Sequence, residues 1–458
     1  MLQLTAIPTE LLQEIFSWTH PEYDLIQCQR LCKSMHRQLS NQQFLKTNFQ
    51  RHLLDLVNAS ATHENLIDQT AVAASISAAE RLQEMEHRWF KWSELYQQVF
   101  IKVKLRGTSE LELALSGYKN GKIPSSIQHV GPQLRVLNLS NSSLQGEIPA
   151  SIGALTGLQR LDLSHNLLEG VIPATIGHLR LLTHLDLSAN RLSGRIPESI
   201  GNLSMLKMIN ASNNRLTGPL PNALFQDCSN LEAIQFEVNL LDGSIPHELI
   251  HATNLKTLDL RCNRLTGTLP AQAFTRLQCL ESLDVSYNQL QGTIPTQLGP
   301  SCPELKHLNL SHNLLTGEIP LELWDAHQLR NVYLKQNQLY GELSGKIGNC
   351  TRLSALSVSN NSLSGKLPPA LGECRELSHL MLSGNQFEGI IPKTWETLEH
   401  VGYFDLGGNP GLKSCEGLSQ GSGWKFQEVV KTSNSRFPQF FAGLRGMWSK
   451  GFFRLRVL

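Results

Sequence analysis

Side chains able to recognise a partner depart from a repeated pattern between residues 235 and 336. Elsewhere the matching positions carry Asp, Asn or Ser, as in the sequence LDLS at residues 161–164. In this stretch they carry charged, aromatic and other residues, and Tyr and Arg are enriched at protein-recognition hot spots. The departures are Gln235, Glu237, Val238, Arg261, Cys262, Tyr287, His307, His312, Tyr333, Lys335 and Gln336. They favour a surface that binds a protein or peptide substrate, and the alternative is sequence drift on an unused surface.

These residues do not form a pattern typical of a metal site or a catalytic centre. His307 and His312 are five positions apart and have no Cys or Asp at ligand spacing, which argues against zinc. The chain has no GxSxG, Walker, HExxH or kinase motif. Asp162 and Asp186 belong to the repeated LDLS pattern, which indicates a structural role. We therefore expect no enzyme activity, no cofactor and no metal ion.

The elements that must position the recognition residues recur with a nearly constant period. Asparagines about two dozen positions apart each follow apolar residues three, five and eight positions earlier, and most precede an LxGxIP segment. A period of this length predicts a solenoid, because one repeat cannot bury its own apolar side and must stack on its neighbours. The asparagines stand at 166, 190, 214, 239, 263, 288, 313, 337, 361, 385 and 409.

The spacing within one repeat predicts its local structure. Leu161 and Leu163 lie on a short strand and point into the core of the solenoid, so Asp162 between them points away from that core. Asn166 follows where the chain turns, and its amide can both donate to and accept from buried backbone groups. Gly170 permits a tight bend. The strands therefore present their outward side chains on the inner, concave face of the solenoid.

This pattern resembles the leucine-rich repeat family, and its LxGxIP ending resembles the subclass known from plant receptors. The resemblance covers about residues 134–412, and residues 105–133 read as a degenerate capping repeat. The expected fold class is an α/β solenoid, an arc of about twelve repeats, preceded by a small all-helical domain.

Residues 1–56 carry a second motif. Apolar residues at helical spacing predict three short helices, and the landmarks resemble the F-box pattern LPxELLxxIF…DLxxxxxVCKxxxxL. They are Ile7, Pro8, Glu10, Leu11, Leu12, Ile15, Phe16, Asp24, Leu25, Leu31, Cys32, Lys33, Leu39 and Phe44. Ile7 and Leu31 replace the more common Leu and Val. The alternative reading is a plain three-helix cap on the solenoid.

F-boxes bind the SKP-type adaptor of cullin–RING ubiquitin ligases, so the resemblance implies an adaptor-binding surface here. Its expected members are Pro8, Leu11, Leu12, Ile15, Phe16, Leu25, Leu31 and Cys32.

Two further segments complete the domain organisation, which is 1–56, 57–104, 105–412 and 413–458. Residues 57–104 read as a linker with an aromatic amphipathic helix from about 76 to 100. The tail at 413–458 interleaves aromatic and basic residues, so we expect it to cap the solenoid, stay disordered, bind an acidic partner or lie on an anionic membrane surface.

Composition and motifs limit the cellular compartment in which the protein is expected. Lys and Arg total 40 against 39 Asp and Glu, so no charge imbalance points to nucleic acid. The nine cysteines form neither a metal pattern nor an even disulfide framework, and no signal peptide or apolar run of about 18 residues is visible. We expect a cytoplasmic protein, with a nuclear or cortical location also open, that is neither secreted nor membrane-spanning.

Together these patterns predict a substrate-recognition subunit of an SCF-type cullin–RING ubiquitin ligase. The F-box would bind the adaptor, and the concave face of the repeats would bind a protein substrate. The alternative is a ligase-independent leucine-rich-repeat scaffold or receptor-like interaction module.

Overall fold

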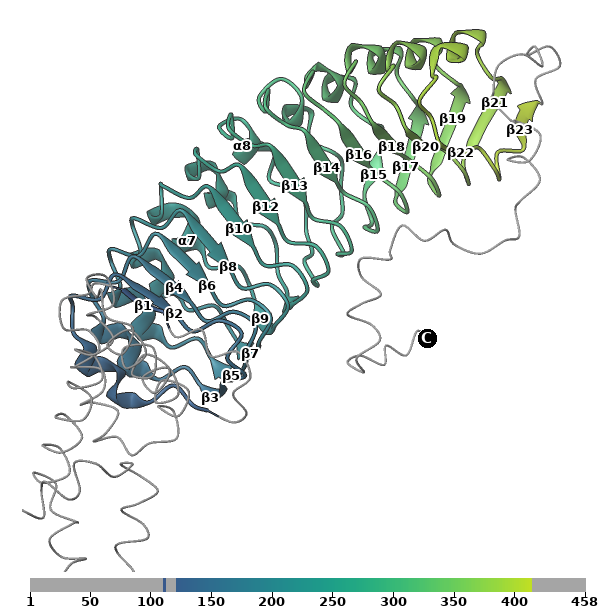
Figure 1. Ribbon diagram of the computed structural model, residues 1–458. Helices are drawn as coiled ribbons and strands as arrows, with labels where there is room; N and C mark the ends of the chain where they lie inside the picture. The colour runs from purple at the N-terminus through teal and green to yellow at the C-terminus, as the bar shows by residue number, and fades with distance from the viewer. Residues whose placement is uncertain (1–109, 113–120, 414–458) are drawn as a thin grey trace, which may run out of the picture.

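The computed structural model describes residues 110–112 and 121–413, which form one curved arc of stacked turns (Figure 1). The predicted helical domain at 1–56, the linker at 57–104 and the predicted tail at 413–458, apart from Lys413, lie outside the described residues.

A parallel sheet of thirteen strands lines the inner side of the arc (Figure 1). Each strand is short and pairs in register with the equivalent residues of the next repeat, as Leu137 pairs with Leu161 and Leu161 with Leu185. The strands are β1 (Glu110–Glu112), β2 (Val136–Asn138), β4 (Arg160–Asp162), β6 (His184–Asp186), β8 (Met208–Asn210), β10 (Ala233–Gln235), β12 (Thr257–Asp259), β13 (Ser282–Asp284), β14 (His307–Asn309), β16 (Asn331–Tyr333), β18 (Ala355–Ser357), β20 (His379–Met381) and β22 (Tyr403–Asp405).

The LxGxIP segments form two five-stranded parallel sheets along one flank. The first contains β3 (Gln145–Glu147), β5 (Leu167–Val171), β7 (Arg191–Gly194), β9 (Arg215–Gly218) and β11 (Leu240–Leu241). The second contains β15 (Thr316–Gly317), β17 (Gln338–Glu342), β19 (Ser362–Lys366), β21 (Gln386–Ile390) and β23 (Gly411–Lys413). Between them, isolated bridges join Ser244 to Thr266 and Thr268 to Gln291.

Short helices form the outer side of the arc (Figure 1). Most are 3₁₀ helices that begin directly after the proline of the LxGxIP segment, whose fixed φ suits a helix start. They are η4 (Ser125–Val130), η5 (Ala150–Ala154), η6 (Ala174–His178), η7 (Glu198–Asn202), η8 (His247–His251), η9 (Thr296–Leu298), η10 (Leu321–Asp325), η11 (Gly345–Asn349), η12 (Pro369–Glu373) and η13 (Lys393–Thr397), with two α-helices, α7 (Asn222–Asp227) and α8 (Ala271–Phe274). At η11 the proline is replaced by Ser344, whose Oγ accepts a hydrogen bond from the backbone N–H of Lys346 at 3.2 Å.

The repeated leucines form one continuous core along the arc. Leu158, Leu161 and Leu163 are each at most 1% exposed. The repeated asparagines join neighbouring repeats at the edge of this core. Nδ2 of Asn166 donates to the carbonyls of Leu139, Leu163 and Ser164 at 2.8–3.1 Å, and its Oδ1 accepts from the backbone N–H groups of Ser142 and Leu144.

The structure therefore confirms the predicted α/β solenoid. β1, inside the segment read as a degenerate repeat, pairs in parallel with β2 and continues the sheet. Within residues 110–112 and 121–413, the structure contains no helix long and apolar enough to cross a bilayer.

Candidate functional site: the inner face of repeats 235–336

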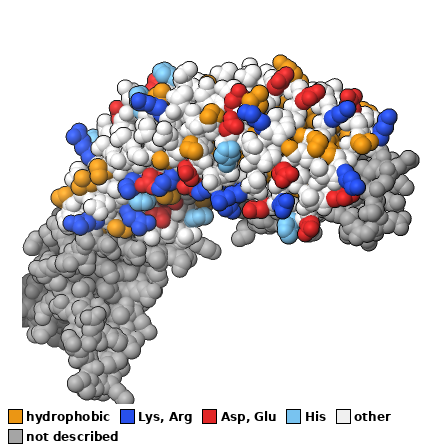
Figure 2. Space-filling view, turned by 90° about the horizontal axis from the view of Figure 1, so that it is seen from above, with side chains coloured by type: hydrophobic (Ala, Val, Ile, Leu, Met, Phe, Trp, Pro, Cys, Tyr) orange, Lys and Arg blue, Asp and Glu red, His pale blue; other side chains and the backbone are white. Residues whose placement is uncertain are grey.

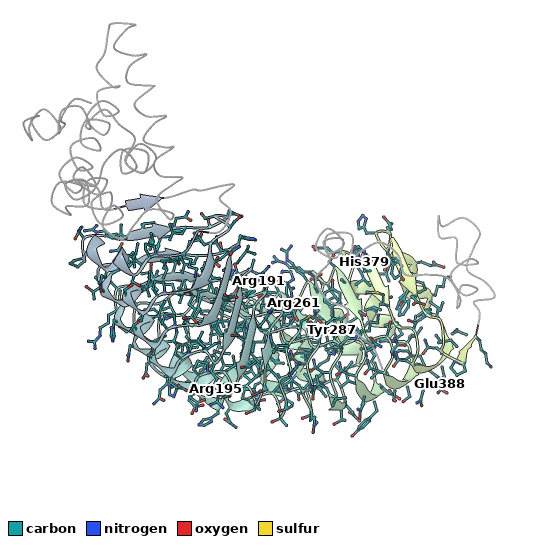
Figure 3. The ribbon with its side chains drawn as sticks, turned by 90° about the horizontal axis from the view of Figure 1, so that it is seen from below. Arg191, Arg195, Arg261, Tyr287, His379 and Glu388 are labelled. Atoms are coloured by element: carbon teal, nitrogen blue, oxygen red, sulfur yellow. The ribbon has the colours of Figure 1, made fainter. Side chains whose placement is uncertain are left out.

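The inner face is built from residues that the core does not use. Strand residues alternate between the buried leucines and outward side chains, so each strand adds outward residues to rows that cross the sheet. Figure 3 shows Arg261, Tyr287 and His379 toward the concave side of the arc, and Arg195 and Glu388 along its outer border.

A guanidinium surrounded by carboxylates lies at the centre of this face. Nη1 of Arg261 is 3.6 Å from Oδ2 of Asp259 and 3.8 Å from Oδ2 of Asp284, and Nη2 is 3.9 Å from Oε1 of Glu237. The carboxylate side chains are 12–17% exposed, whereas the Arg261 side chain is 45% exposed. We call Glu237, Asp259 and Asp284 the acidic cluster.

The members of the acidic cluster differ in how well their carboxylates are hydrogen-bonded. Asp284 accepts from the N–H and Oγ of Ser286 at 2.9 and 2.6 Å, and from Nδ2 of Asn309 at 2.9 Å. At the neighbouring strand Arg261 occupies the position of that serine, so Asp259 accepts from the Arg261 N–H at 3.2 Å and gains no hydroxyl.

The acidic cluster has more acidic groups than basic groups to pair with them. Burial raises the pKa of Asp259 to about 7, with further raising by the charges of Asp284 and Glu237 and opposition from Arg261. Glu237 is 9% exposed, and its Oε2 is buried with no hydrogen-bond partner in the described part of the chain. The cluster therefore holds three carboxyl groups, of which Asp259 is about half protonated near pH 7, against one guanidinium.

A row of apolar and aromatic side chains lies beside the acidic cluster, and Val238 and Cys262 directly follow Glu237 and Arg261 in the chain. Val238, Cys262, Tyr287 and His312 occupy the same repeat position, and we call them the αL strip because their φ angles are 54–57°. Val238 is 40% and Tyr287 44% exposed, and Cys262 is also exposed. The rings of Tyr287 and His312 stack with centroids 3.9 Å apart and planes 12° apart.

The stacked histidine is uncharged near neutral pH. Burial, aided by the charge of Lys335, lowers the pKa of His312 to about 4. Burial also raises the pKa of Tyr287 above its ordinary value. The αL strip thus presents a neutral surface beside a negative one.

The structure brings together four of the eight predicted substrate-binding residues as two contacting pairs. Arg261 pairs with Glu237, and Tyr287 stacks on His312. His307 lies at the other end of its strand, where its Nδ1 is 2.8 Å from Nδ2 of Asn331. Gln235 and Tyr333 are half-buried in β10 and β16, and Lys335 follows β16. A role for any of the eight in binding stays a prediction.

Asp259 and Asp284 were missed by sequence reasoning because they match the Asp of the repeated pattern. The available signal was the residue two positions later, where Arg261 replaces the serine that normally binds the aspartate.

A separate row of ion pairs runs across the start of the strands. Glu232 pairs with Lys207 at 3.3 Å and Lys256 at 2.7 Å, and Glu281 pairs with Lys306 at 2.6 Å. Figure 2 shows basic and acidic side chains gathered along the inner border of the arc. Among the described residues, no group of three or more His, Cys, Asp and Glu side chains is arranged to hold a metal ion.

Family comparisons match both parts of the chain. A profile described as "F-box-like" matches residues 4–51, which confirms the predicted resemblance there. Profiles described as "Leucine rich repeat" match residues 132–192 and 253–298, and 205–226, 304–326, 352–374 and 376–398. The residues expected to contact the adaptor, from Pro8 to Cys32, lie outside the described part of the structure, so that role also stays a prediction. The comparison with curated proteins gives no match.

Solved structures similar to this one include plant receptor ectodomains. The Arabidopsis receptor kinase HAESA, in a complex with the peptide hormone IDA and the co-receptor SERK1, is 32% identical with a TM-score of 0.59 over 69% of this chain and 55% of that one. The plant peptide hormone receptor RGFR1, in complex with RGF2, is 31% identical with a TM-score of 0.55 over 68% and 57%. A TDR receptor is 28% identical with a TM-score of 0.53 over 70% and 69%.

This chain spans little more than half of the HAESA and RGFR1 chains that it matches. The likeness extends to the solenoid, and the F-box-like match lies before it. The chain therefore combines an F-box-like domain at residues 4–51 with a solenoid of leucine-rich repeats.

Proposed function

We propose that this protein is the substrate-recognition subunit of an SCF-type cullin–RING ubiquitin ligase. The observation that carries the proposal is the presence, in one chain, of an F-box-like match at residues 4–51 and a leucine-rich-repeat arc. The first would bind the SKP-type adaptor and the second a protein substrate.

The inner face supports the second half of the proposal. It carries exposed aromatic and charged side chains over neighbouring repeats, and such residues are enriched at recognition surfaces. The similar receptors HAESA and RGFR1 were solved with peptide hormones bound, which favours a peptide segment as the ligand class.

The proposed subunit works by proximity and supplies no reacting group. Holding a substrate near the conjugating enzyme raises the effective concentration of its lysines, and this can accelerate transfer without a new catalytic contact. Cofactor and metal play no part in this mechanism.

Affinity purification of the full chain from cells tests the proposal. We expect recovery of an SKP-type adaptor, with loss of most of it in a Leu12→Asp, Phe16→Asp double variant, because two carboxylates would replace two apolar side chains of the expected contact surface. An Arg261→Ala variant is the control and should recover as much adaptor as the unmodified chain.

Adaptor recovery that is absent, or that survives the double variant, would contradict the ligase role. The chain would then be a ligase-independent scaffold or receptor-like module, and substrate binding by the inner face would be its whole activity.

A further inference from the structure

The acidic cluster differs from Glu232 and Glu281, the carboxylates of the ion-pair row at the start of the strands. Glu232 and Glu281 each have a lysine within 2.7 Å, so those carboxylates are already paired. In the cluster the shortest approach of the guanidinium to a carboxylate oxygen is 3.6 Å, and Oε2 of Glu237 has no partner among the described residues. One additional donor with a positive charge would complete the arrangement.

Within the αL strip, Val238 departs most from what the backbone favours at its position. Its position needs a positive φ, which suits the Asn or Gly found there at residues 141, 213, 360, 384 and 408, and His165, Ala189 and Gln336 hold the same position in other repeats. Val238 is β-branched and strongly disfavoured in this region. Strained positions of this kind cluster at binding sites, where a side chain is needed despite its conformational cost.

We propose that the acidic cluster and the αL strip form one subsite that binds a lysine or arginine side chain of an extended substrate segment. The cation would be held by Glu237 and Asp284. Its aliphatic stem and a neighbouring apolar residue would contact Val238 and the stacked rings of Tyr287 and His312. This names the substrate chemistry for the protein-binding face under Proposed function and rests on that proposal.

The charges of the described residues favour a cation over an anion. Arg261 is the basic residue at the centre of the subsite, and carboxylates surround it on three sides at 3.6–3.9 Å. A phosphate or carboxylate approaching Arg261 would meet their negative charge. The face of a neutral aromatic ring attracts a cation, and His312 with its lowered pKa stays neutral beside Tyr287.

The test uses mixtures of short fluorescent peptides that share degenerate flanks and differ in a fixed central residue: Lys, Arg, Gln, Glu or phosphoserine. Binding of each mixture to the full chain is measured by fluorescence polarisation. We expect the Lys and Arg mixtures to bind about tenfold more tightly than the Gln mixture, as one charge-assisted hydrogen bond would give. Equal binding of all five, or tighter binding of Glu or phosphoserine, would overturn the proposal.

Charge-neutral variants test whether the preference for cationic peptides comes from the acidic cluster. Glu237→Gln with Asp284→Asn keeps the side-chain shapes and should remove the tenfold preference. The matched control is Asp162→Asn with Asp186→Asn, two carboxylates at the strand position of Asp284 in β4 and β6, and it should keep the preference. If the control loses the preference as well, the effect is a property of the whole face and the subsite is disproved.

A third variant guards against misfolding. Val238→Asn places a residue that tolerates positive φ in the αL strip, so it should fold at least as stably as the unmodified chain. We expect it to weaken binding of the Lys mixture by about threefold, since it removes apolar contact area. An unchanged affinity would exclude the strip from the subsite.

Adaptor recovery is measured on the same preparations, so the two proposals fail separately. A chain that recovers the adaptor without preferring cationic peptides contradicts only the subsite. A chain that prefers cationic peptides without recovering the adaptor contradicts only the ligase role.

Discussion

Asp259 shows how one residue replacement changes the chemistry of a repeated position. In the neighbouring repeat the serine after the strand binds Asp284 through both its N–H and its hydroxyl. Arg261 in its place leaves Asp259 buried among other carboxylates, which raises the pKa of Asp259 to about 7. A carboxyl group with a pKa near neutrality makes stability depend on pH.

We expect the free energy of unfolding to fall as the pH rises from about 4 to about 7, because over this window the folded state retains a proton on Asp259 that the unfolded state has released. Asp259→Asn has no carboxyl group at this position, so it removes this pH-dependent loss of stability. The variant should therefore be more stable than the unmodified chain at pH 8, by up to about 4 kcal/mol, and nearly equal to it at pH 4. Urea unfolding at both pH values measures the difference.

Asp186→Asn is the comparison, because Asp186 accepts two hydrogen bonds from Ser188 at 2.9 and 2.6 Å. It should lose stability at pH 8. A gain by both variants, or a pH-independent gain at Asp259, would contradict the assignment.

Sequence reasoning located the face but not its geometry. The period placed Glu237, Arg261, Tyr287 and His312 just after the inner strands, because each stands one or two positions before a repeated asparagine. It could not show that Tyr287 would stack on His312, since the stacking depends on side-chain rotamers. The positive φ angles of the described non-glycine residues were also not predicted, as most of these positions hold residue types that seldom adopt them.

At the scale of elements, repeats that are one residue longer differ from the others in their outer helix. The repeats in which the asparagine spacing grows by one position contain α7, α8 or the shortened η9, while the others contain 3₁₀ helices of one common length, such as η6 and η7. The inner strands keep their register throughout, as β10, β12 and β13 pair residue for residue. The periodic asparagines revealed the extra residues, but the type of helix depended on packing between repeats.

Close packing of the outer helices gives an element-scale prediction. A Cβ on Gly177, in η6, would lie 2.3 Å from the backbone oxygen of Ser199 in the next helix. Gly177→Ala should therefore force the two helices apart and cost about 2–4 kcal/mol. The matched control is Gly345→Ala at the start of η11, where a Cβ would have nothing within 4 Å.

Thermal unfolding of the two glycine variants measures this difference. The Gly345 variant should unfold within a degree or two of the unmodified chain, because a surface substitution without new contacts is nearly neutral. Similar losses in both variants would show that backbone freedom, and not the approach of neighbouring helices, explains the glycine at 177.

At the scale of the whole molecule, each repeat interacts with its immediate neighbours, so the arc can change length by whole repeats. Leu353 and Leu377 occupy equivalent, fully buried positions in successive repeats. Deleting residues 353–376 should give a chain that folds with unchanged preference for Lys-centred peptides and loses a few kcal/mol of stability. Circular dichroism and the peptide assay measure both properties.

Deleting only residues 353–364 is the control for that experiment. It joins the end of one repeat to the middle of the next and should unfold the carboxy-terminal part of the arc. If both deletions are equally tolerated, the repeats beyond Arg352 contribute little to the fold.

The buried asparagines are also sites where deamidation would damage the fold. Hydrolysis of one side-chain amide would convert Asn166 or its equivalents to aspartate, and asparagine is among the residues most prone to thermal damage. The new carboxylate cannot donate, so the carbonyls of Leu139, Leu163 and Ser164 would lose the hydrogen bond from Nδ2 of Asn166, although Ser164 would keep the one from the backbone N–H of Asn141. Because each such amide joins two turns of the arc, a single deamidation event anywhere along its length would loosen a junction, and long-lived copies of the protein should accumulate breaks in the stack.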